Sequence, residues 1–165
     1  MVVIVGGVRY RSEFARRVLA ETDDRVRLVG PIYDSAALNA LYAHALVYLH
    51  GHEVGGTNPS LLRAMGAGTA CAALDVPFNR ETLDSAGLYF DPGEGSLSTL
   101  LRDLESDPPR TTAFSRLALE RAASFYRWSA VASSYSSLLT SLATSPRQVT
   151  LPTVAYLPSA SAPDL

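Results

Sequence analysis

Short apolar runs alternate with segments of helical periodicity along residues 2–90 of the chain. The apolar runs predict strands at residues 2–5, 26–29, 46–49, 69–74 and 88–90. The segments between them predict helices at residues 12–21, 35–45 and 59–67. Alternation of this kind is typical of parallel strands joined by crossover helices. The predicted fold class is therefore α/β, with one parallel sheet flanked by helices. Residues 46–49 are expected inside this sheet, where Val47 and Leu49 are buried with Ile4 and Leu28.

The chain becomes helical beyond Gly95. Periodicity predicts helices at residues 97–104, 112–126 and 129–142. Prolines among Ser, Thr and Ala from Ser145 onward favour a segment without fixed structure. The predicted organisation is one domain at residues 1–144, followed by a Pro/Ser-rich flexible tail at residues 145–165.

Composition narrows the classes of partner. A net charge of -2, with 47 % hydrophobic and 18 % charged residues, gives no electrostatic reason to expect nucleic acid. No run approaches the roughly 18 apolar residues of a transmembrane helix, and no signal peptide is visible, so the expected location is cytoplasmic. The single Cys71 predicts a buried structural thiol. His44, His50 and His52 lack acidic or thiol partners at ligand spacing, so neither a metal nor a cofactor is expected.

A glycine loop leads into a predicted helix between His50 and Gly68. Asn58 is a good helix cap, and Pro59 suits the first helical position because its missing N–H has no intrahelical partner. The free N–H groups at this helix end attract anions, and glycines allow a ligand to approach the backbone. The candidate anion and sugar site comprises Gly55, Gly56, Thr57, Asn58, Pro59 and Ser60.

Several further short motifs occur in a fixed order around this loop. They are Arg27-Leu-Val-Gly-Pro-Ile-Tyr-Asp34, His50, Ala64-Met65, Asp75-Val-Pro-Phe-Asn-Arg80, Gly87-Leu-Tyr-Phe90 and Tyr126-Arg-Trp-Ser-Ala-Val-Ala132. Together with the loop, they resemble the nucleotide-sugar-binding half of retaining GT-B type glycosyltransferases of group 1 (family 4), especially bacterial rhamnosyltransferase-like enzymes. The resemblance implies a Rossmann-like domain with a helical C-terminal extension, which is one half of a GT-B fold.

The resemblance assigns roles to three loops that follow strands. Gly30, Pro31 and Ile32 contact the base, the glycine loop contacts the sugar and diphosphate, and residues 75–80 lie near the sugar. Arg80 is a candidate cation for the diphosphate. For the first loop, a plain strand-to-helix turn is the alternative, since Gly-Pro serves it equally well. His50 either hydrogen-bonds to backbone near the sugar or is an ordinary histidine whose hydrogen bonds are satisfied within the protein.

The chain departs from the family pattern at Arg63, where members carry a glutamate that bonds the ribose. Arginine only donates hydrogen bonds, so the exchange reverses this role and favours lost ribose recognition. The alternatives are that Arg63 is a surface residue or that it is a new phosphate ligand. The companion glutamate of the motif falls on Gly55, and Glu53 is the nearest acid.

The predicted function is that of the donor-binding domain of a glycosyltransferase in surface polysaccharide synthesis. The sugar is transferred from a nucleoside-diphosphate sugar, either dTDP-rhamnose or a UDP-sugar. The alternative is a non-catalytic nucleotide-sugar-binding or interaction module. By comparison with the family, the first strand of the domain, its basic diphosphate clamp and the acceptor domain are missing, so the isolated chain is expected to be inactive. The chain is expected to self-associate into a homo-oligomer or to pair with another subunit, because loss of the N-terminal domain exposes apolar surface around Trp128 and the glycine-loop edge. Tyr126, Trp128 and Tyr135 are expected to be packing residues.

Overall fold

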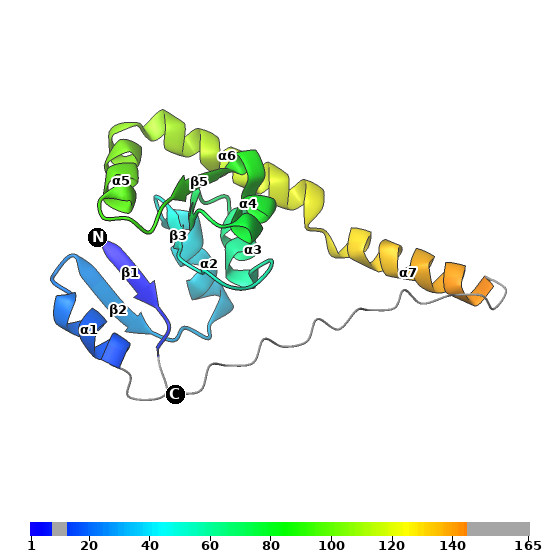
Figure 1. The fold of residues 1–165 in the computed structure, drawn as a ribbon, viewed down its shortest axis with the longest axis horizontal. Coiled ribbons are helices and arrows are strands. Elements are labelled where there is room, and N and C mark those ends of the chain that lie inside the picture. Colours follow the sequence, from blue (N-terminus) through cyan, green and yellow to red (C-terminus); the bar gives the residue numbers. More distant parts are fainter. Residues whose placement is uncertain (8–12, 145–165) are drawn as a thin grey trace, which may run out of the picture. The chain divides into compact units, whose positions relative to one another are not determined.

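The computed structural model describes residues 1–7 and 13–144 (Figure 1). These residues form two compact units, of which the first comprises Met1–Arg127 and the second begins at Trp128. The first unit is an α/β structure with parallel strands and flanking helices, which confirms the predicted fold class.

Three parallel strands form the larger sheet, with β4 (Cys71–Leu74) between β3 (Tyr48–His50) and β5 (Gly87–Phe90). The register pairs Tyr48 with Cys71 and Ala72 with Leu88. Every residue of β4 is buried. A continuous apolar run with both faces covered is typical of a central parallel strand.

Helices cover both faces of this sheet, and Figure 1 shows α5 on one side of β5 with α3 and α4 on the other. One core cluster joins Cys71 and Ala73 of β4 to helices α3 (Pro59–Gly66), α4 (Pro77–Leu83) and α6 (Pro108–Phe125). The other joins Ala70 and Ala72 to Leu104 of α5 (Ser96–Ser106). Alternate residues of one strand therefore serve opposite cores, as the pleat requires.

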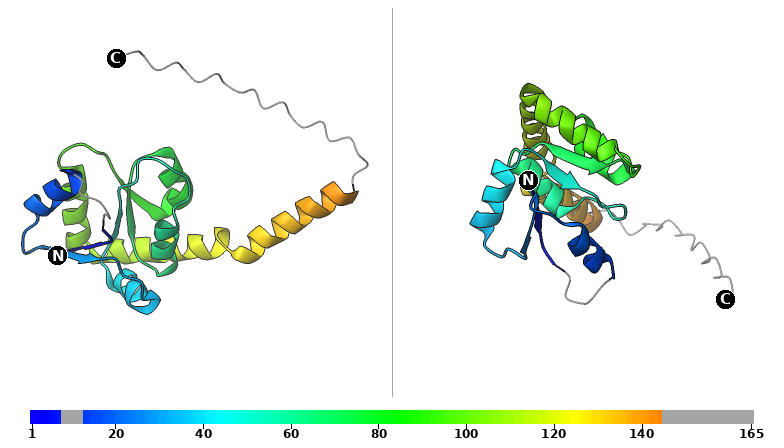
Figure 2. Two further views of the ribbon diagram at one scale, coloured as in Figure 1. Left: turned by 90° about the horizontal axis from the view of Figure 1, so that it is seen from below. Right: turned by 90° about the vertical axis from the view of Figure 1, so that its left-hand side faces the viewer.

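The remaining two strands form a sheet of their own. Strands β1 (Val2–Val5) and β2 (Val26–Gly30) run parallel and lie side by side in Figure 2, with α1 (Glu13–Glu21) between them in the sequence. Within the described residues, no ladder joins either strand to β3, β4 or β5. The prediction of one sheet containing residues 2–5, 26–29 and 46–49 is therefore wrong.

The prediction that residues 46–49 lie inside the sheet is also wrong. The strand there is β3, which pairs only with β4, so β4 is the central strand. Val47 and Leu49 are half-buried rather than buried. Ile4 and Leu28 are 39 % and 41 % exposed, because a two-stranded sheet has little surface to cover either face.

Residues 75–80 were expected to form a loop, but most of them belong to α4. Pro77 occupies the first turn of this helix after Val76 in an extended conformation. Proline is over-represented at that position, so Val76-Pro77 was the signal for a helix start that the sequence prediction overlooked. The 3-10 helix η1 (Asp84–Ala86) follows and leads into β5.

Two further helices complete the description. Helix α2 (Ser35–His44) is capped by the Asp34 carboxylate, which accepts from the backbone N–H groups of Ala36 and Ala37. Helix α7 (Trp128–Thr144) belongs to the second unit.

The three aromatic residues predicted to pack differ in burial. Tyr126 packs on the core of the first unit, but Trp128 is 86 % exposed and Tyr135 is also exposed. The packing role predicted for Trp128 and Tyr135 is therefore wrong. The predicted tail at residues 145–165 and the predicted helix start at Ser12 lie outside the described residues.

Candidate functional site

The N-terminus of α3 is built as the sequence predicts. Asn58 has extended backbone angles and caps the helix, and Pro59 is its first residue. The Asn58 Oδ1 atom accepts from the backbone N–H of Ser60 at 2.9 Å and from the Ser60 hydroxyl at 2.7 Å. The first turn is therefore fixed, and the positive end of the helix dipole faces the preceding loop.

The glycine loop leaves its backbone donors available. Residues 51–57 are all exposed, and Gly55 has a φ of +138°, which favours glycine. In the described part of the chain, the N–H groups of Gly55, Gly56 and Thr57 have no hydrogen-bond acceptor. Consecutive free N–H groups beside a helix N-terminus form an anion-binding arrangement.

His50 is the last residue of β3 and precedes this loop. It is 1 % exposed, and its ring stacks on the exposed ring of His52 with 4.7 Å between centroids. The Nδ1 atom lies 3.4 Å from the Tyr48 hydroxyl, which lies 2.8 Å from the Ser60 hydroxyl. Polar groups therefore extend in a line from the end of β3 to the cap of α3.

Burial determines the protonation states of His50 and Tyr48. Burial, with a smaller contribution from His52, lowers the pKa of His50 to about 4, so the imidazole is neutral at physiological pH. Burial also raises the pKa of Tyr48. Among the described residues, the only buried side-chain nitrogen or oxygen without a hydrogen-bond partner is His50 Nε2.

Arg63 and Glu53 are both exposed. The Nε atom of Arg63 donates to the Asn39 Oδ1 atom of α2 at 2.9 Å, which ties α3 to α2. The Arg63 side chain therefore lies on the side of α3 that faces α2, where it is already hydrogen-bonded.

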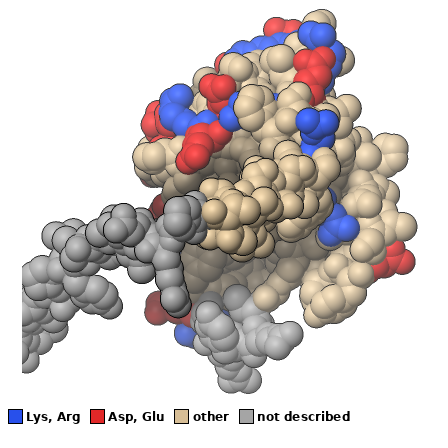
Figure 3. Space-filling model, turned by 90° about the vertical axis from the view of Figure 1, so that its right-hand side faces the viewer, with Lys and Arg blue, Asp and Glu red and all other residues tan. Residues whose placement is uncertain are grey.

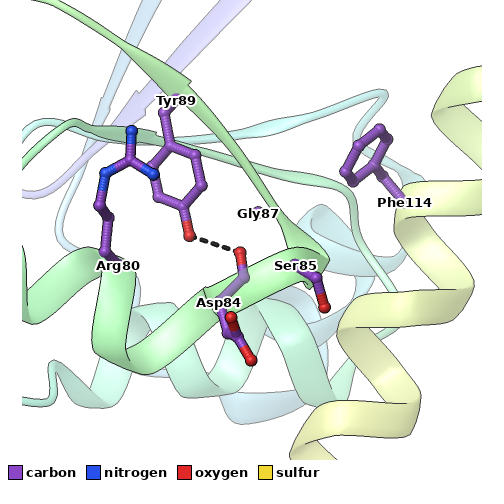
Figure 4. A pocket seen from close by; sticks show the side chains of 6 residues that line it. All are labelled: Arg80, Asp84, Ser85, Gly87, Tyr89 and Phe114. Atoms are coloured by element: carbon purple, nitrogen blue, oxygen red, sulfur yellow. Dashed lines mark hydrogen bonds between the residues drawn. The ribbon is translucent and has the colours of Figure 1, made fainter.

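Arg80 is already neutralised. Its guanidinium forms a two-pronged ion pair with the Asp75 carboxylate and stacks on the Tyr89 ring, 4.4 Å from the ring centroid. Hydrogen bonding to Arg80 lowers the pKa of Asp75. Arg80 also lines a cavity of about 450 Å³ with Asp84, Ser85, Gly87, Tyr89 and Phe114 (Figure 4).

The three predicted loops are not all on one sheet. Residues 51–58 and 75–76 follow the neighbouring strands β3 and β4, so both lie at the carboxyl edge of the larger sheet. Gly30 ends β2, with Pro31 and Ile32 after it, at the corresponding edge of the smaller sheet. Gly30 has a φ of +69°, and its carbonyl accepts from the N–H of Gly6 at 2.8 Å, which continues the pairing of β1 with β2 by one residue.

Sequence reasoning missed two polar residues beside the loop. Asn79 is buried in α4 and donates to the carbonyl oxygens of Leu74 and His52 at 2.9 and 3.3 Å. Tyr48 connects His50 to Ser60. A period of two along β3 could have placed Tyr48 on the face of His50, whereas no local signal connects Asn79 to a loop 27 residues earlier.

Within residues 1–7 and 13–144, no three His, Cys, Asp or Glu side chains are grouped to hold a metal ion. None of the helices described in this range is long and apolar enough to cross a membrane.

The family described as glycosyl transferases group 1 matches residues 1–106, which is more than half of the chain. The chain belongs to this glycosyltransferase family. A comparison with curated proteins finds no match.

Three solved structures share the fold. Sucrose-phosphate synthase from Thermosynechococcus elongatus has a TM-score of 0.74 at 24 % identity, covering 85 % of this chain and 38 % of that one. Anabaena HepE in complex with UDP has a TM-score of 0.74 at 17 % identity, covering 84 % and 40 %. The GtfA/B complex has a TM-score of 0.61 at 22 % identity, covering 85 % and 29 %. The chain thus spans well under half the length of these matched chains, and its fold matches one part of each.

Proposed function

We propose that residues 55–60 bind the diphosphate and sugar of a nucleoside-diphosphate sugar. The observation that carries this proposal is the exposed glycine loop, whose free N–H groups adjoin the capped N-terminus of α3. Such a site stabilises a diphosphate with amide dipoles and needs no metal ion. The family membership supports a sugar nucleotide as the anion.

The donor we propose is dTDP-rhamnose or a UDP-sugar, used in surface polysaccharide synthesis. HepE has been solved with UDP and with UDP-glucose, which supports a pyrimidine nucleotide. Gly30, Pro31 and Ile32 are proposed as base contacts. His50 and Glu53 are proposed to lie near the sugar. Arg80 is proposed as a diphosphate ligand, which requires its guanidinium to leave Asp75 and bind the diphosphate instead.

The proposed role of this chain is donor binding without efficient turnover. Amide donors stabilise a diphosphate leaving group, but both Arg63 and Arg80 are engaged by side chains of this chain. A non-catalytic nucleotide-sugar-binding module is the second candidate, and it predicts ligand binding with no sugar transfer in any assembly. A cytoplasmic location stays a prediction.

Calorimetric titration with UDP, dTDP and GDP tests the proposed site. A Cβ at Gly56 meets no atom within 4 Å, so Gly56→Val fills the space over the loop without a clash inside the protein. We expect it to weaken nucleotide binding at least about tenfold, because the side chain blocks the backbone donors. Gly66→Val, at the other end of α3 and equally open, is the matched control. Equal affinities of both variants and the wild type would place the site elsewhere.

Arg63→Glu tests the hypothesis that an arginine in place of the family's glutamate has removed ribose recognition. A glutamate restores an acceptor for ribose hydroxyls, so UDP should bind more tightly while inorganic pyrophosphate binds no better. Asn39→Ala removes the partner of Arg63 without adding an acceptor and serves as the control. Weaker UDP binding by Arg63→Glu would identify Arg63 as a phosphate ligand.

We further propose that α7 pairs with a second copy or with another subunit. Its exposed apolar residues recur at intervals of three and four, at Trp128, Val131, Tyr135, Leu138 and Leu142. The helix contains no charged residue. Residues other than Lys, Arg, Asp and Glu, drawn in tan, fill the middle of the face shown in Figure 3. Light scattering should show association that Leu138→Ser weakens, and a monomer at high concentration would contradict a homo-oligomer.

A further inference from the structure

The hydrogen atoms in the polar line beside the glycine loop can be placed from its acceptors. Asn58 Oδ1 receives the backbone N–H of Ser60, so this atom is the amide oxygen and only accepts. The Ser60 hydroxyl lies 2.7 Å from the same oxygen and therefore donates its single hydrogen to it. Ser60 Oγ has no second hydrogen for Tyr48.

The direction of the next two hydrogen bonds follows. Since the hydrogen of Ser60 is used, the Tyr48 hydroxyl must donate to Ser60 Oγ across 2.8 Å. The Tyr48 oxygen can then only accept from His50 Nδ1, 3.4 Å away. The neutral imidazole consequently carries its proton on Nδ1, and Nε2 holds an unshared electron pair.

This electron pair is buried and has no donor in the described part of the chain. A buried acceptor without a partner is costly, so Nε2 favours a ligand that brings a hydrogen. Ionised phosphate oxygens bring none, whereas sugar and ribose hydroxyls do. We propose that His50 Nε2 accepts a hydrogen bond from a hydroxyl of the bound sugar nucleotide, which makes His50 a hydroxyl-recognising residue and not a phosphate ligand. This inference rests on the proposed sugar-nucleotide site.

His50 Nε2 is buried, so a hydroxyl reaches it only when neighbouring groups move, and the glycine loop that follows His50 is weakly tied. Among the hydrogen bonds of the described residues, only that from Asn79 Nδ2 to the His52 carbonyl, at 3.3 Å, holds residues 51–57. The exposed His52 ring is stacked on His50 from the loop side. We expect the His52 ring to move when the ligand binds.

Binding of UDP-glucose and UDP to His50→Phe tests the proposal. Phenylalanine keeps a ring in the buried position but lacks the acceptor, so affinity should fall about 3- to 10-fold, as expected for one neutral hydrogen bond. His44→Phe, the same change at an exposed helix position, should leave both affinities unchanged. Loss confined to UDP-glucose identifies a sugar hydroxyl, and equal loss for both ligands identifies a ribose hydroxyl.

The tautomer provides a readout that does not depend on binding. Nitrogen-15 NMR of the wild type should show His50 protonated at Nδ1 and unprotonated at Nε2, with Nε2 shifting when UDP-glucose is added. Tyr48→Phe removes the acceptor of the Nδ1 hydrogen and should move the proton towards Nε2, which provides a second variant if His50→Phe does not fold. A proton on Nε2 in the wild type would overturn the inference, as would unchanged affinities of folded His50→Phe. A wild type that binds neither UDP nor UDP-glucose would overturn the proposed function and this inference together.

Discussion

The strands β1 and β4 have opposite environments, although β1 is the more hydrophobic by sequence. The four residues of β1, Val-Val-Ile-Val, are all exposed, whereas the four residues of β4, Cys-Ala-Ala-Leu, are all buried. Strand β4 has a neighbour on each side and helices over both faces, whereas β1 pairs only with β2. Burial of a strand is therefore decided by the elements that cover it, and the apolar character of its residues alone does not ensure it.

The helices show the same contrast. Helix α3 buries Leu61, Ala64 and Met65 against β4, while α1 buries none of its residues. Each face of β4 contributes small side chains, Cys71 and Ala73 on one side and Ala72 on the other, which lets the helices approach closely. The stability of the described structure is thus expected to reside in the three-stranded sheet and its helices.

Leu61→Ala should produce the largest effect. Leu61 is fully buried in the cluster that joins α3 to β4, so its truncation should cost about 2–5 kcal/mol of unfolding free energy. Ile4→Ala in the smaller sheet should cost less than about 1 kcal/mol, because Ile4 keeps much of its surface in contact with water. Urea unfolding measures both, and equal losses would contradict the contrast between the two sheets.

Gly87→Ala should have the next largest effect. A Cβ at Gly87 would lie 2.6 Å from Leu83 Cβ and 2.8 Å from the Tyr89 hydroxyl. Overpacking of this kind costs about 1–3 kcal/mol. Gly93→Ala, where a Cβ meets nothing within 4 Å, is the control and should be neutral or slightly stabilising. Thermal unfolding of the pair shows whether the larger sheet is as tightly packed as its burial indicates.

The pH dependence of stability should reveal the buried imidazole of the larger sheet. Burial lowers the pKa of His50 to about 4 from the usual 6.5, so protons bind more strongly to the unfolded chain. The stabilisation is complete above the unfolded pKa and is lost as the pH falls towards the folded one. Between about pH 7 and pH 4.5, the wild type should lose about 2 kcal/mol more than His50→Phe, which does not titrate there.

Urea unfolding of both proteins at the two pH values provides this measurement. The difference between them removes the carboxylates, including Asp75, that titrate in both. Parallel losses of stability would mean that His50 has an ordinary pKa and is not desolvated in solution.

Trp128→Ala should have the smallest effect on the folding of the first unit. Trp128 is 86 % exposed, so the free energy of unfolding should change by less than about 0.5 kcal/mol at low protein concentration. Tyr126→Ala, two residues earlier, should cost more than about 1 kcal/mol, since Tyr126 packs on the core and its hydroxyl donates to the Thr82 carbonyl at 3.2 Å. A large loss at Trp128 would show that α7 is packed in the monomer.

Much of the local structure could be predicted from the sequence. The five strands, most helices and the Asn58-Pro59 start of α3 follow from periodicity and capping, because these depend on residues close in sequence. Helix α4 was not predicted, although Val76-Pro77 is a local signal for the start of this helix. The position of the glycine loop before α3 was likewise readable from neighbouring residues.

The sequence by itself therefore determined which segments become strands and helices, and which helix presents free donors beside two glycines. Only the tertiary structure decided that the strands divide into two sheets, since each strand's hydrogen-bonding edge can pair with any suitable neighbour. It also decided the state of individual side chains: Arg63 is held by Asn39, 24 positions away, and Arg80 by Asp75. The proton on His50 depends on Tyr48, Ser60 and Asn58 together, because a hydrogen bond acquires its direction only when all of its neighbours are in place.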